Sequence, residues 1–173
     1  RGFRLFIPLT GVTFSAGLML GQYRDAGFYL FLAVGFWLAL WGHHLFFKEK
    51  LQTEFAVGFV ALVTSASLWG LGGDMEGMKW CIALCLGSGL GFVTSRYLLS
   101  YIRICEHCER GTAQTSYLLG WDAGLLAGYS VAFGLGTEVG QTIYTYIIGA
   151  IFVGTGMYHL FLVRPWYMRN KRK

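Results

Sequence analysis

Charged residues are scarce in this chain. Only 13% of its 173 residues are Asp, Glu, Lys or Arg, while 55% are hydrophobic; a soluble domain usually has about 25% charged residues. A compact soluble domain leaves a large share of its residues in contact with water, so it could not hide this much apolar surface. The composition therefore excludes an ordinary soluble domain and indicates that lipid is part of the solvent.

Proline is also nearly absent, whereas glycine is abundant. The chain has 2 Pro and 25 Gly. A transmembrane helix satisfies its own backbone hydrogen bonds, so it tolerates glycine, and small residues let two such helices approach closely. Together with the long apolar runs, this predicts an all-α, polytopic membrane protein.

Residues 1–173 read as one transmembrane domain with six spans. Each apolar segment has about 20 residues, the length that a helix needs to cross roughly 30 Å of hydrocarbon. The first segment follows Arg1 and Arg4 as in a signal peptide, but five comparable segments follow it, which disfavours that interpretation. Because the chain begins at Arg1 and not at Met, we expect it to be part of a longer protein. The predicted spans are residues 3–22, 27–47, 55–73, 78–104, 112–135 and 141–163.

Basic residues are distributed unequally between alternate connections. Eleven fall on one side of the predicted spans and two, Arg24 and Lys79, on the other. By the positive-inside rule, the richer side is cytoplasmic, so both termini are expected inside the cell. The cations separate apolar runs instead of forming one patch, so the expected partner is the lipid bilayer and not nucleic acid. The basic tail at residues 169–173 is expected to lie on anionic headgroups.

Two ionisable residues fall inside predicted spans. Arg96 and Asp122 each lie about 13–15 Å from the cytoplasmic surface, counted along their helices. An unpaired charge at that depth is expensive, so we expect them to form an ion pair or to share a water-filled cavity. Two interpretations stay open: a structural bridge, or a functional site in which Asp122 is protonated or Arg96 binds an anionic substrate group.

Neighbouring residues fit either interpretation. Gln114, Tyr117 and Trp121 form a polar and aromatic stripe near Asp122, which could face a substrate cavity or pack against another helix. Small residues at four-residue spacing predict close helix packing. These are Gly87, Gly91, Gly120, Gly124 and Gly128.

Three other motifs are not expected to carry chemistry. Gly87-Ser88-Gly89 lies in an apolar span, so it does not have the strand-to-helix context of a dinucleotide loop. Ser88 and His159 suggest an intramembrane serine protease, but they differ in depth by roughly 12 Å, too far for a nucleophile and its base. Cys105-Glu106-His107-Cys108 offers a single C-x-x-C pair, whereas structural zinc sites usually have two. We therefore expect no enzyme activity, no metal and no cofactor.

One stretch resembles a known family. Residues 108–117 (CERGTAQTSY), followed by Gly120-Trp121-Asp122-Ala123-Gly124, resemble the tenth loop and eleventh helix of major facilitator superfamily (MFS) transporters. The glycine-rich segment 87–96 resembles their tenth helix, and the closest likeness is to Bacteroides-type bacterial members. With its six spans and orientation, the whole chain corresponds to the C-terminal half of that fold.

The resemblance implies a function. Such proteins are secondary transporters with two six-helix halves that bind a small solute between them and alternate its access by rocking. It implies that spans one, two, four and five line the cavity, that an N-terminal six-helix half is the partner, and that the protein lies in the cell inner membrane. Proton-coupled transport is the expected function, with Asp122 and Arg96 on the substrate or proton pathway. The alternative is a membrane scaffold or assembly protein in which the two residues form only a structural pair.

Overall fold

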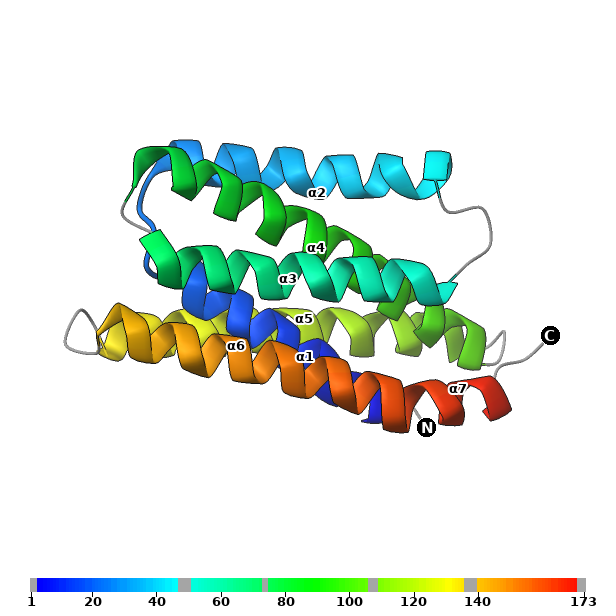
Figure 1. Cartoon of the computed structure of the whole chain (residues 1–173). Helices are drawn as coiled ribbons and strands as arrows, with labels where there is room; N and C mark the ends of the chain where they lie inside the picture. The colour runs from blue at the N-terminus through cyan, green and yellow to red at the C-terminus, as the bar shows by residue number, and fades with distance from the viewer. Residues whose placement is uncertain (1–2, 47–50, 73–74, 106–108, 136–139, 171–173) are drawn as a thin grey trace.

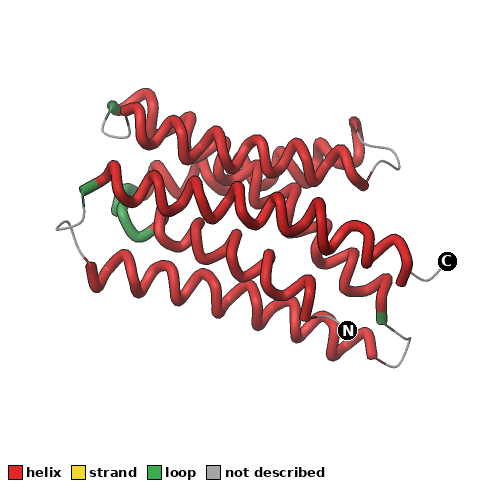
Figure 2. The backbone as a smooth tube through the Cα atoms, turned by 60° about the horizontal axis from the view of Figure 1, so that its bottom comes forward, coloured by secondary structure: helices red, strands yellow, loops and turns green. Residues whose placement is uncertain are grey.

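The structure is a computed structural model that describes residues 3–46, 51–72, 75–105, 109–135 and 140–170. Within these ranges nearly every residue is helical (Figure 1), and Figure 2 shows the same bundle without a strand in the described ranges. The helices are α1 (Phe3–Leu20), α2 (Ala26–Phe46), α3 (Leu51–Gly72), α4 (Glu76–Ile104), α5 (Arg110–Leu135), α6 (Gln141–Tyr158), the π-helix η2 (His159–Val163) and α7 (Arg164–Asn170).

The prediction of an all-helical protein with long apolar helices is confirmed. Five helical stretches are long and apolar enough to cross a membrane: Phe3–Leu20, Thr53–Gly72, Gly77–Ile104, Arg110–Leu135 and Gln141–Asn170. The fifth runs without a break from α6 through η2 into α7. α2 is apolar over the shorter stretch Ala26–Gly42, so its role as a sixth span stays a prediction.

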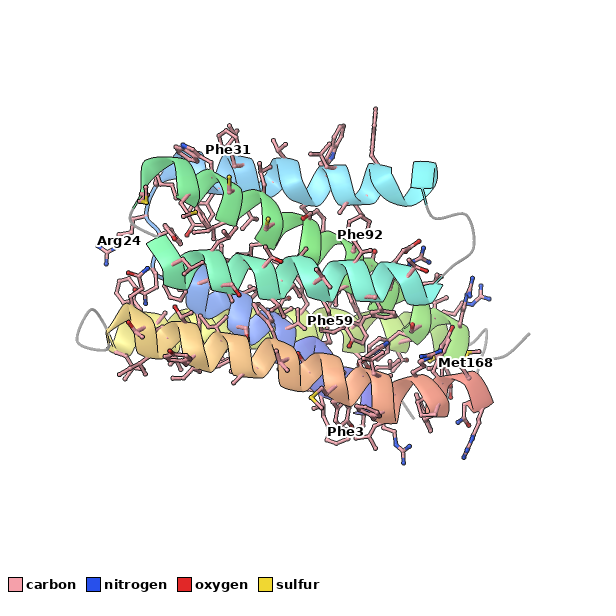
Figure 3. All side chains as sticks on the ribbon, viewed as in Figure 1. Phe3, Arg24, Phe31, Phe59, Phe92 and Met168 are labelled. Atoms are coloured by element: carbon pink, nitrogen blue, oxygen red, sulfur yellow. The ribbon has the colours of Figure 1, made fainter. Side chains whose placement is uncertain are left out.

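Successive helices run in opposite directions, so the start of α1 and the end of α7 lie at the same end of the bundle (Figure 1). We call this the basic end. Arg24 lies at the opposite end from Met168 (Figure 3), and Lys79 lies near the start of α4, also away from the basic end. The described arginines of the basic end are Arg4, Arg103, Arg110, Arg164 and Arg169.

α4 is the central helix. It packs closely against α2 and α3 and touches α1 and α5, while α1 packs against α5 and α6, and α6 against α3. Its inner side is correspondingly buried: Ile82, Leu86, Val93 and Tyr97 are all fully shielded. α2 and α5 lie at the margins of the bundle, each with a long exposed face.

Glycines set the two closest helix contacts. On α5, a Cβ added to Gly128 would overlap the carbonyl oxygen of Phe14 on α1. On α4, a Cβ added to Gly87 would overlap the carbonyl oxygen of Leu32 on α2. A Cβ added to Gly91, Gly120 or Gly124 would also lie closer to the neighbouring helix than ordinary van der Waals contact allows. The two helix pairs therefore meet backbone to backbone, which only a residue without a side chain permits.

At the other end, Asp25 joins α2 to α4. Its Oδ1 accepts the backbone N–H of Gly27 at 3.0 Å, as an N-cap does at the start of a helix. Its Oδ2 lies 3.3 Å from the ammonium of Lys79. These two contacts, the hydrogen bond first, hold the pKa of Asp25 below its usual value of 3.8.

Candidate functional site

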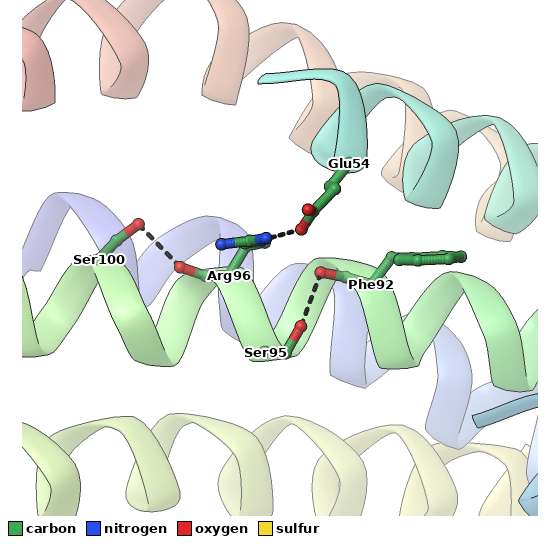
Figure 4. Close-up of polar contacts among 5 residues, drawn as sticks. All are labelled: Glu54, Phe92, Ser95, Arg96 and Ser100. Carbon is green, nitrogen blue, oxygen red and sulfur yellow. Dashed lines mark hydrogen bonds and ion pairs between the residues drawn. The ribbon is translucent and has the colours of Figure 1, made fainter. Parts of the chain in front are cut away.

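Arg96 pairs with Glu54 and not with the predicted partner Asp122. The guanidinium of Arg96 extends from α4 toward α3, where its Nε donates to Oε2 of Glu54 (Figure 4). Glu54 is fully buried and Arg96 is 6% exposed. A charged pair so deep in a low-dielectric core needs close contact, because Coulomb attraction must offset the loss of hydration of both ions.

A second polar contact lies beside this ion pair. The hydroxyl of Tyr97 is 3.2 Å from Nδ1 of His159, at the first residue of η2. The imidazole lies 4.0 Å from the ring of Phe55, centroid to centroid, and Phe55 meets Tyr97 edge to face at 5.1 Å. His159 is 7% exposed, so a hydrogen-bond partner is what makes its burial tolerable.

The ion pair and the Tyr97–His159 contact lie at the same level of the bundle and join three helices, because neighbouring residues of α3 and of α4 make them. Glu54 and Phe55 on α3 face Arg96 and Tyr97 on α4, and η2 adds His159. We call these five residues the polar cluster. One turn further along α4, Ser100 donates to the carbonyl of Arg96 (Figure 4), which keeps that hydroxyl satisfied within the helix. The cluster fixes the register of α3, α4 and α6.

Asp122 lies elsewhere, on the exposed side of α5. It is the thirteenth of the 26 residues of that helix, so it is close to the middle of the predicted span. The glycines that face α1 explain its direction: Asp122 is two residues from both Gly120 and Gly124, about 200° around the helix from that buried ridge. The prediction that Asp122 meets Arg96 is wrong. The two residues were placed at the same depth along their helices, but Asp122 points away from α4.

The remaining predicted site residues separate in the same way. Gln114 is exposed on the side of Asp122. Tyr117 is buried, with its ring 6.2 Å from that of Tyr101 on α4, and Trp121 is half-buried beside it at 6.4 Å. The stripe is therefore divided: Tyr117 and Trp121 pack inward, while Gln114 and Asp122 belong to what we call the α5 outer face. Its members are Gln114, Thr115, Leu118, Leu119 and Asp122.

Sequence reasoning missed Glu54 and the Tyr97–His159 contact. The predicted third span began at Phe55, which left Glu54 in the connection, whereas α3 begins at Leu51. The sequence did hold an indication of Glu54. A buried Arg96 needs a carboxylate at the same depth, and Glu54 directly precedes the apolar run of the preceding helix, α3. The partner of Tyr97 had no such signal, since it depends on how α6 crosses α3 and α4.

The other motifs are placed as follows. The hydroxyl of Ser88 donates to the carbonyl of Cys85, and His159 contacts Tyr97, so these two residues have separate partners. Cys105 is half-buried at the end of α4, and residues 106–108 of its motif lie outside the described residues. Within the described ranges, no group of three or more His, Cys, Asp or Glu side chains is arranged to hold a metal ion.

A comparison with protein-family models and with curated proteins finds no match to this chain. The polar cluster is closed and internally paired, which suits a fixed structural role. The α5 outer face is open and carries an ionisable group at mid-helix, which suits contact with water, solute or another protein.

Proposed function

We propose that this chain is the C-terminal six-helix half of an MFS-type secondary transporter, which moves a small solute by alternating access and is coupled to protons. The observation that carries the proposal is the exposure of Asp122 at the middle of an apolar, 26-residue helix. A charged side chain facing lipid at that depth costs about 2.5–3.5 kcal/mol on insertion scales. Ionisable groups at that depth normally face a water-filled cavity or the interior of a bundle.

The outer face of α6 provides the contrast. From residue 142 to residue 162 its exposed side chains include Ile143, Ile147 and Val153 and no charged group. That face suits lipid, whereas the α5 outer face offers Gln114, Thr115 and Asp122. The difference supports a molecule with one side toward the bilayer and another toward a partner half and a solute pathway.

In this proposal Asp122 takes up and releases the coupled proton, and Gln114 and Thr115 provide polar contacts on the same face. Arg96 has a different role from the one that the sequence suggested. Bound to Glu54, it acts as a positioning residue that holds α4 against α3. Tyr117 packs between α5 and α4 with Trp121 beside it on α5, so neither side chain belongs to the open face that carries Asp122.

The proposal includes six spans, with α2 as the second, in the cell inner membrane. The basic end is the cytoplasmic end, because its arginines agree with the positive-inside rule. Both termini are then inside the cell. The resemblance of residues 108–124 to the eleventh helix of MFS transporters supports the same assignment.

A membrane scaffold or assembly protein is the second candidate. The observation in its favour is the polar cluster, whose buried contacts lock α3, α4 and α6 together. A scaffold needs such rigidity, whereas it has no use for a titrating group on α5.

Transport by the complete protein distinguishes the two candidates. The complete protein is reconstituted in vesicles that contain a pH-sensitive dye, and a panel of small solutes is added one at a time. The transported solute should drive uptake of protons into the vesicles. We expect Asp122→Asn to abolish solute-driven proton uptake at unchanged expression and thermal stability, and Tyr146→Phe, an exposed side chain on α6, to retain it. Normal uptake by the Asp122→Asn variant would refute the role of Asp122, and no uptake with any solute would favour the scaffold.

A further inference from the structure

The last helix carries an apolar groove with a cationic edge. At the basic end, Leu160, Phe161 and Met168 are 52%, 70% and 49% exposed. With Arg164 and Pro165 they line an open groove of about 370 Å³. The groove spans the junction of η2 and α7, on the outer side of the bundle.

The position of this groove along the helix matches the membrane boundary. Arg164 lies about 23 residues after Gln141, or roughly 34 Å along a helix. The hydrocarbon core is roughly 30 Å thick. When Gln141 is at one boundary, Leu160 and Phe161 lie at the inner edge of the acyl chains and Arg164 lies among the headgroups.

The charged residues of this helical segment are all basic. Residues 141–170 contain Arg164 and Arg169 and no acidic residue. Arg169 follows Pro165 by four positions, so it continues the face that lines the groove. On the inner side of α7, the half-buried Trp166 lies under the guanidinium of Arg4, at 5.7 Å from the ring centroid. That contact fixes α7 against α1 and so orients the groove outward.

We propose that this groove binds an anionic phospholipid of the bilayer. The phosphodiester lies between the guanidinium groups of Arg164 and Arg169, and an acyl chain lies along Leu160, Phe161 and Met168. Guanidinium suits the phosphate oxygens because it offers several N–H donors in one plane. A zwitterionic lipid adds an ammonium group, which two arginines repel, and a free phosphate has no chain for the apolar wall. This binding does not depend on the transport proposal.

The test measures lipid retained by the full-length protein after extraction from vesicles of mixed phosphatidylglycerol and phosphatidylcholine. Native mass spectrometry then counts each bound lipid. Each juxtamembrane arginine strengthens binding to an anionic surface about fivefold, so Arg164→Gln with Arg169→Gln should lower phosphatidylglycerol affinity about 30-fold. The matched control is Arg110→Gln, an exposed arginine at the same end on α5, which should change it less than about twofold. Arg164→Lys with Arg169→Lys keeps both charges and should retain most of the preference.

A second pair of variants tests the apolar wall. Phe161→Ala should weaken retention of phosphatidylglycerol several-fold, whereas Leu119→Ala should not, although Leu119 is 62% exposed on α5 and Phe161 is 70% exposed. Equal losses in the Arg110 and the Arg164/Arg169 variants would overturn the proposal, because the attraction would then be a diffuse field of the basic end. So would displacement of the lipid by millimolar inorganic phosphate together with an unchanged Phe161→Ala variant, which would indicate a phosphate site.

Discussion

At the scale of single residues, the Glu54–Arg96 pair is the least replaceable contact. Glu54→Gln leaves the guanidinium of Arg96 buried without a counter-charge, and breaking one side of a buried pair costs about 3–5 kcal/mol. We expect that loss in the free energy of unfolding in detergent. The double variant Glu54→Leu with Arg96→Met removes both charges and should recover most of it. A double variant as unstable as the sum of the two single variants would show that the two residues do not interact.

Two tyrosines give a matched pair of predictions. The hydroxyl of Tyr97 contacts His159, so Tyr97→Phe should lower the free energy of unfolding by about 1 kcal/mol or somewhat more. The hydroxyl of Tyr144 is buried and has no hydrogen-bond partner within the described ranges, so Tyr144→Phe should be neutral or stabilising. Thermal unfolding of both variants in one detergent checks this, and the reverse order would contradict the assigned contacts.

Sequence alone located Arg96 and Asp122 as ionisable residues within spans, but it paired them wrongly. Depth could be counted along each helix, because the rise per residue is fixed. Direction around the helix could also have been read, since the ridge of Gly120, Gly124 and Gly128 defines the side of α5 that packs. What no pattern could give is the crossing of η2 over α3 and α4 that brings His159 to Tyr97.

At the scale of helices, the backbone contact between α1 and α5 leaves no room for an added methyl group. Gly128→Ala places a Cβ against the carbonyl of Phe14, and neither backbone can move without shifting its helix. We expect a loss of about 1–3 kcal/mol in the free energy of unfolding, as for other overpacked sites. The control is Gly154→Ala on α6, where nothing lies within 4 Å of the added Cβ. A Gly128→Ala variant as stable as this control would mean that the helices are further apart.

The start of α2 should make stability depend on pH. The pKa of Asp25 is lower in the folded protein than its usual 3.8, so its contribution is complete above the unfolded pKa and is lost as the pH falls through the folded pKa. Asp25→Asn should therefore melt at a lower temperature than the wild type at neutral pH. The difference should shrink as the pH falls below 3.8 and disappear once the pH is below the pKa of Asp25 in the folded protein. Melting curves from pH 7 to pH 2 would reveal this, and a constant difference would exclude titration of Asp25 as its cause.

The helices themselves were predicted well. All six predicted segments begin within four residues of the observed helices, and five of them within two, because long apolar runs interrupted by charges leave few alternatives. The exceptions are at the ends: α3 starts four residues earlier than predicted, which brings in Glu54, and α6 continues through η2 into α7 beyond residue 163. Charged and proline-containing ends of helices look like connections in sequence. They continue a helix here because Glu54 is paired with Arg96, while Arg164 and Pro165 at the start of α7 are exposed.

At the scale of the whole molecule, the two outer faces of the bundle differ in chemistry. The α5 outer face carries Asp122 at mid-helix, and the face of α6 is apolar at the same level. In the sequence, the glycine ridge of α5 marks the side of that helix that packs. The open side of α6 is shown only by the packing of that helix against α1 and α3.

The accessibility of single cysteines to water tests this difference most directly. In the complete protein, with native cysteines replaced by serine or alanine, Asp122→Cys and Leu118→Cys are compared with Ile147→Cys and Val153→Cys on α6. Labelling by a charged, membrane-impermeant maleimide is followed in intact membranes. We predict that both α5 positions react and both α6 positions stay unlabelled, because the α5 outer face lines an aqueous pathway. Unreactive cysteines at positions 118 and 122, in a protein that labels fully once denatured, would contradict that pathway.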